Sequence, residues 1–188
     1  MFTHKPITLA LGVALLFLLA CDNQRTTRSD TTEVTYTLDR HEPSPMFWDY
    51  AASTTMLQTE LGKLASEKTQ DSMILIFADS ALVIHSKALQ SLRKIAEKYK
   101  HIQLPDSLTG SDKEMVAEFK MLEGEAFESR YQEYLMLNHK AQLNRYQETL
   151  SETEDPALRQ WLNTMRARLR AQLQYYTEAD TVKEEEEL

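Results

Sequence analysis

Two histidines and two glutamines stand on otherwise apolar stripes of the sequence. His85 follows Phe77 and Ala81 by eight and four residues, and His139 interrupts a second stripe at the same relative depth. Gln58 and Gln172 interrupt two further stripes. An imidazole can hold a transition metal, carry a proton or hydrogen-bond within a core, and a carboxamide can donate and accept hydrogen bonds. The four residues Gln58, His85, His139 and Gln172 are therefore the candidate polar core layer.

Metal binding and core hydrogen bonding are the two interpretations of this layer. Two neutral amides are weak ligands, and no Glu-x-x-His sequence of the di-iron bundles is present. We therefore expect His85 and His139 to be buried and hydrogen-bonded to the glutamines or to neighbouring tyrosines, with both pKa values below 6.5. A metal site on these two histidines is the alternative. The sequence predicts no catalytic residue and no cofactor, because it shows no nucleophile–base pair, phosphate loop or distinctive pair of acids.

Four long amphipathic helices must position the layer. Apolar residues at three- and four-residue spacing predict them over 45–68, 72–100, 125–150 and 156–178. Ser44-Pro45, Asp71 and Asp155-Pro156 provide N-caps for the first, second and fourth. The capping-box spacing of Ser111 and Glu114 predicts a short helix over 111–122. Short connections favour an all-α, antiparallel four-helix bundle with one short extra helix between the second and third long helices.

The composition supports an all-α domain and excludes several classes of protein. The chain has 188 residues, of which 42% are hydrophobic and 27% charged, with only 4 Gly and 5 Pro for the turns of an all-β fold. Its 1 Cys excludes an internal disulfide framework and a thiolate zinc cluster. The net charge of -8 argues against binding to phosphate backbones, so we expect no nucleic-acid partner.

The N-terminus resembles a bacterial lipoprotein signal. Lys5 precedes the apolar run Ile7 to Ala20, which as a helix would span roughly 21 Å, short of the ~30 Å membrane core. The run therefore predicts a signal peptide over 1–20 and not a membrane-spanning helix. Leu18-Leu19-Ala20-Cys21 is similar to a lipobox, and this resemblance implies cleavage after Ala20 and acylation at Cys21 by fatty acids such as palmitate. The alternative is an ordinary cleaved signal with an incidental cysteine.

Acylated Cys21 would make the lipid bilayer a partner of the protein. The polar stretch over 21–44 is then a disordered tether, the folded domain covers 45–178, and the charged residues 179–188 form an acidic tail. The domain would lie outside the cytoplasm in the bacterial cell envelope, on the periplasmic side or at the cell surface. The sequence leaves open which membrane holds the anchor.

Several motifs in the helical region resemble one bacterial family. They are the run Ala51 to Ala65, Phe77-Ala78 ahead of His85, Leu122 to Phe127 with Tyr131, Asn138-His139, and Asp155 to Leu158. In order and spacing they are similar to the domain of unknown function 4142 family over about 46–176. The resemblance implies a ferritin-like fold, common among secreted proteins and lipoproteins, and no established activity.

The chain departs from that family's pattern at the polar layer. The pattern has Glu where this chain has Gln58, His where it has Gln172, and Asp-His pairs where it has Ile84-His85 and Asn138-His139. Losing these carboxylates disfavours a metal site.

The sequence thus predicts a membrane-anchored envelope lipoprotein with a non-catalytic ferritin-like bundle. Its role would be binding, protective or structural, with a protein partner that the sequence does not identify. The alternative is a metal- or redox-handling ferritin-like protein that uses the core histidines. We do not expect an enzyme.

Overall fold

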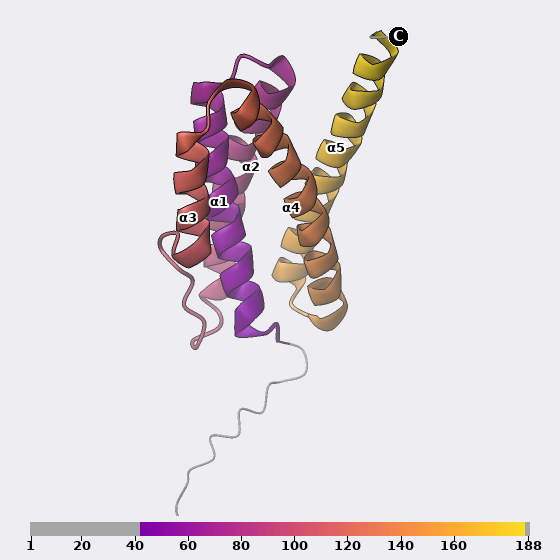
Figure 1. Ribbon diagram of the computed structural model, residues 1–188. Helices are drawn as coiled ribbons and strands as arrows, with labels where there is room; N and C mark the ends of the chain where they lie inside the picture. The colour runs from indigo at the N-terminus through magenta and orange to yellow at the C-terminus, as the bar shows by residue number, and fades with distance from the viewer. Residues whose placement is uncertain (1–41, 187–188) are drawn as a thin grey trace, which may run out of the picture. The chain divides into compact units, whose positions relative to one another are not determined.

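The computed structural model describes residues 42–186, with side chains from 42 to 178. The predicted signal peptide, Cys21 and the tether up to residue 41 lie outside the described residues, as do the side chains of the predicted acidic tail. The described part holds five α-helices and no strand, so the all-α prediction is confirmed (Figure 1). The helices are α1 (Pro45–Lys68), α2 (Ser72–Ala96), α3 (Gly110–Met121), α4 (Gly124–Glu152) and α5 (Pro156–Glu186).

Three helix starts follow from the capping residues that the sequence shows. The Ser44 hydroxyl accepts from the backbone N–H of Phe47. The Asp71 carboxylate accepts from Ile74 N–H at 2.9 Å, and the Asp155 carboxylate accepts from Leu158 N–H at 2.8 Å. Each bond satisfies a backbone donor that the first helical turn leaves without a partner.

The boundaries differ from prediction at several helix ends. α3 begins at Gly110, whose φ of 52° follows an extended Thr109, and no side-chain cap is made, so the predicted capping box does not form. α2 ends at Ala96, four residues before the predicted end. α5 runs on to Glu186, eight residues past its predicted end, because no Gly or Pro follows Pro156 to stop it.

The long helices α1 and α2 pack closely, and α1 also contacts α3 and α4, while α5 contacts α4 and α2 (Figure 1). Gly62 allows the close approach of α1 and α2. A Cβ atom added at Gly62 would lie 2.9 Å from the Cβ of Ala81 and 3.1 Å from the carbonyl oxygen of Ala78. The missing side chain is therefore part of this helix pair's packing.

Apolar side chains gather in two core clusters at opposite ends of the long helices. The first contains Phe47, Trp48, Ala51, Ala52, Ala88, Leu92, Ile95, Ala96, Tyr146, Leu150, Leu158, Trp161, Leu162, Met165 and Leu169. The second contains Leu57, Leu61, Ala65, Met73, Ile74, Phe77, Ala78, Val116, Phe119, Phe127, Tyr131, Tyr134 and Leu135. In α2 and α4 the candidate histidines fall between the segments that supply the two clusters, and in α5 Gln172 lies between Leu169 of the first cluster and Tyr176, which packs against the second.

α2 is the one described helix that is long and apolar enough to cross a membrane. Its contacts are those of a core helix, since His85 and Leu92 are fully buried and α1 and α5 pack against it. Its outer side nevertheless exposes Ile76 (51%) and Val83 (55%).

Candidate polar core site

The structure places the four predicted residues on four different helices. Gln58 on α1, His85 on α2 and His139 on α4 are buried, with at most 2% of their surface exposed, and Gln172 on α5 is half-buried. The four do not form a single hydrogen-bonded group. Two separate networks form instead, and both involve neighbouring residues of α4.

The first network links α4, α5 and α2. His139 Nε2 lies 2.8 Å from Gln172 Oε1, and Gln172 Nε2 donates to the Ser80 hydroxyl at 3.0 Å. Because the amide nitrogen faces Ser80, the amide oxygen accepts from His139, whose proton is then on Nε2. Sequence reasoning missed Ser80, because a single serine beside the apolar stripe of a helix does not indicate a hydrogen-bonding role.

The second network links α1 to α4 through Asn138. The Gln58 side chain donates to Asn138 Oδ1 at 2.7 Å, Gln142 donates to the same oxygen, and the Tyr146 hydroxyl donates to Gln142 Oε1 at 3.2 Å. Sequence reasoning missed Asn138 and Gln142. The available signal was the row at 138, 142 and 146, which places three polar groups on one helical face.

His85 is the exception in this layer. It is fully buried, and neither ring nitrogen has a hydrogen-bond partner among the described residues. The predicted bond from His85 to a glutamine or tyrosine is therefore wrong, because Gln58 is held by Asn138 and Gln172 by His139 and Ser80. An unsatisfied buried polar group costs about 1–3 kcal/mol.

The environment keeps both imidazoles neutral. Burial lowers the pKa of His85 from 6.5 to about 3, helped by the nearby His139 and the positive charge of Arg168. Burial also lowers the pKa of His139 to about 4, opposed by its hydrogen bond to Gln172. Neutral imidazole is the form that accepts a metal or a hydrogen bond.

The donor set does not fit a divalent metal centre of the di-iron type. Within residues 42–178, no group of three or more His, Cys, Asp or Glu side chains is placed to share an ion. The polar layer offers imidazole nitrogens and amide oxygens, with no carboxylate to offset the charge of an ion. The two hydrogen-bond networks connect α1 to α4, and α4 to α5 and α2.

Comparisons with known proteins identify a family and no close relative. No curated protein and no solved structure matches the chain. One family model, described as Domain of unknown function (DUF4142), matches residues 31–178, which include all of α1 to α4 and most of α5. The chain therefore belongs to the family Domain of unknown function (DUF4142).

Proposed function

We propose that this protein is a lipoprotein of the bacterial cell envelope, held on a membrane by acylated Cys21. The observation that carries the proposal is the sequence Leu18-Leu19-Ala20-Cys21, which ends the apolar N-terminal run at the one cysteine of the chain. Several acyl chains, at ~0.8 kcal/mol for each buried methylene, would give lasting attachment.

The helical domain would be the functional part outside the cytoplasm. α1 begins at Pro45, and if residues 21–44 form the tether that the sequence predicts, a flexible chain of that length would have an r.m.s. span of roughly 25 to 30 Å. The domain could then reach partners at some distance from the bilayer. Its four long helices would form a ferritin-like, antiparallel four-helix bundle, with α3 as the extra short helix.

A non-catalytic role is supported by the polar layer. Its groups are neutral, and three of the four are held by hydrogen bonds, Gln58 with Asn138 and His139 with Gln172. Such networks fix the mutual positions of helices. We therefore propose a binding, protective or structural role, with the chemistry of recognition on the surface of the domain.

Lipid attachment is tested by replacing Cys21 with alanine in cells fed radiolabelled palmitate. We expect the wild-type chain to incorporate label and Cys21→Ala to lose it completely, because the thioether cannot form without the thiol. Thr26→Ala, a substitution a few residues further along, should keep full labelling. Unchanged labelling of Cys21→Ala would refute the anchor.

Metal or redox handling is the second candidate function. The observation that favours it is that three ring nitrogens, both of His85 and Nδ1 of His139, lack a hydrogen-bond partner among the described residues. Unpartnered buried polar groups call for an explanation, and an ion is one of them.

Metal analysis of the purified protein separates the two functions. Because the layer has no carboxylate, we expect elemental mass spectrometry of the purified protein to find less than about one tenth of an equivalent of zinc or iron per chain. Stoichiometric metal that is lost in His139→Leu and kept in His101→Leu would establish the second function. His101 is a suitable control because its side chain is 54% exposed and pairs with Glu42.

A further inference from the structure

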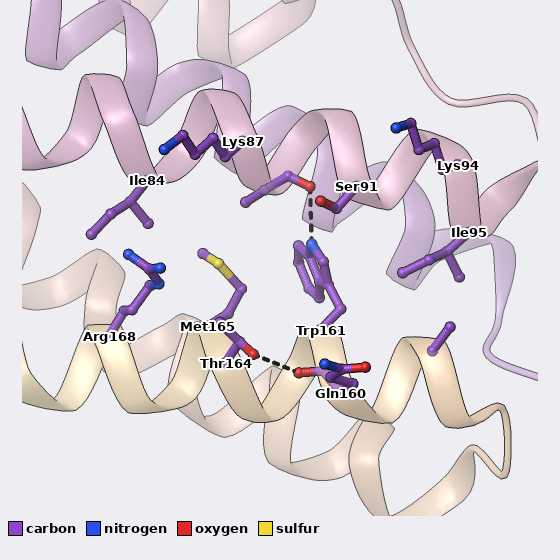
Figure 2. A pocket seen from close by; sticks show the side chains of 12 residues that line it. Ile84, Lys87, Ser91, Lys94, Ile95, Gln160, Trp161, Thr164, Met165 and Arg168 are labelled. Atoms are coloured by element: carbon purple, nitrogen blue, oxygen red, sulfur yellow. Dashed lines mark hydrogen bonds between the residues drawn. The ribbon is translucent and has the colours of Figure 1, made fainter.

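A groove with an apolar floor runs between α2 and α5 (Figure 2). Its volume is about 400 Å³, within the range of about 300–1,000 Å³ for small-molecule sites. Ile84 and Ile95 of α2 face Trp161 and Met165 of α5 across it. The indole N–H of Trp161 donates to the carbonyl of Ala88 at 2.9 Å, which fixes the ring in the floor.

Three cations edge this groove. Lys87 and Lys94 lie along α2 and Arg168 reaches up from α5 (Figure 2), and no acidic residue is among the lining residues. In the described part of the chain, none of the three forms an ion pair with a carboxylate. By contrast, Arg93 pairs with Asp106 and Lys98 with Asp155 just outside the groove. This concentration of unpaired positive charge stands out in a chain of net charge -8.

The apolar floor continues beyond the first pocket. A second pocket of about 230 Å³ shares Ile84 and Arg168 with the first and extends along the helices past Ile76 and Tyr175. From Ile76 to Ile95 the helix rises roughly 28 Å. One acyl chain spans roughly half of the ~30 Å hydrocarbon core of a bilayer, so the groove is long enough to hold it.

We propose that the groove between α2 and α5 binds a single-chain anionic amphiphile, a long-chain fatty acid. The acyl chain lies on the floor formed by Ile84, Trp161 and Met165. The carboxylate lies at the positive edge, where Lys87, Lys94 and Arg168 together attract it. Burial of the chain supplies the affinity, and the cations select an acid over a neutral lipid. The proposal needs neither acylation of Cys21 nor a metal on the histidines.

Quenching of tryptophan fluorescence by dibromostearate tests the proposal directly. Bromine quenches an indole that it contacts, and Trp161 lies in the floor, whereas the other tryptophan, Trp48, has no exposed surface. The full chain is held at a constant concentration of a non-ionic detergent. We expect saturable quenching by dibromostearate and about tenfold weaker quenching by its uncharged methyl ester, since attraction to three partly exposed cations contributes on that order.

Matched variants locate the site. The triple variant Lys87→Gln, Lys94→Gln, Arg168→Gln should weaken quenching by the acid about tenfold and leave quenching by the ester unchanged. The control variant Lys63→Gln, Lys120→Gln, Lys140→Gln removes the same charge from exposed positions outside the groove and should bind like the wild type.

A steric pair tests the floor independently of charge. Ser91 is exposed and lines the groove, whereas its neighbour Gln90 does not line it. Ser91→Phe should reduce quenching by both acid and ester, and Gln90→Phe should reduce neither. Circular dichroism confirms that each variant is folded.

Three results would overturn the proposal. They are equal quenching of the wild type by acid and ester, an equal loss in the control triple variant, and unchanged binding in Ser91→Phe. Occupation of the groove by an acidic amphipathic peptide, with no effect of stearate, would instead assign it to a protein partner.

Discussion

Acidification from pH 7.5 to pH 4.5 is expected to lower the free energy of unfolding of the helical domain by about 4–6 kcal/mol. His85 and His139 are neutral in the folded state, because burial lowers their pKa values to about 3 and about 4 from the ordinary 6.5 of a histidine. The unfolded chain therefore binds protons as the pH falls through 6.5, while the folded chain does so only near pH 4 and below. Stability falls across this window and is level above it.

The size of the effect follows from the same pKa values. Each histidine is expected to contribute about 2–3 kcal/mol of destabilisation at pH 4.5. A domain typically has about 5–15 kcal/mol of stability, so the two histidines together would remove about a third or more of it. The measurement is urea denaturation followed by circular dichroism at pH 7.5, 6.5, 5.5 and 4.5.

The double variant His85→Leu, His139→Leu isolates the cause. Leucine does not titrate and keeps much of the side-chain volume, so the variant's stability should change little between pH 7.5 and 4.5. His101→Leu, at an exposed position, should keep the wild-type pH dependence. A wild-type domain whose stability stays level down to pH 4.5 would show that water reaches the imidazoles.

Helix positions could be predicted because local signals specify them. Ser44-Pro45, Asp71 and Asp155-Pro156 each act through contacts within one turn, and all three mark helix starts in the structure. The start of α3 differs from the prediction. The capping-box spacing of Ser111 and Glu114 predicts a start at residue 111, whereas the helix begins at Gly110, whose φ is positive. The glycine and the capping-box spacing point to different start residues, and the sequence alone does not indicate which of the two decides the boundary.

The pairing of the polar residues depends on long-range geometry that periodicity does not contain. Apolar spacing indicated that Gln58, His85 and His139 face inward, and all three are buried. It did not indicate that Gln58 would meet Asn138, since that contact depends on the rotation of α1 against α4. The isolation of His85 has the same origin. The groove between α2 and α5 could not be predicted from the sequence either, because its cations lie on two helices that only folding brings together.

Gly62→Leu is expected to lower the free energy of unfolding by about 3 kcal/mol, the largest effect we predict for a residue outside the polar layer. The first added atom alone would stand 2.9 Å from Ala81 Cβ and 3.1 Å from Ala78 O, so α1 and α2 must separate. Their separation loosens the second core cluster, to which Leu61 and Ala78 belong. Urea denaturation at pH 7.5 measures the loss, and Lys63→Leu, at an exposed neighbouring position, should change stability by no more than about 0.5 kcal/mol.

A smaller change at the same position shows whether the helix contact is responsible. Alanine has a better helix propensity than glycine by about 1 kcal/mol, so an uncrowded Gly62→Ala would be stabilising. We expect it to destabilise instead, because the clash with Ala81 and Ala78 outweighs the propensity gain. Adding Ala81→Gly removes the nearer of the two contacts, so the double variant should be more stable than the sum of the single effects predicts. Strict additivity, or a stabilising Gly62→Ala, would mean that α1 and α2 have room between them at this point and that Gly62 does not set their spacing.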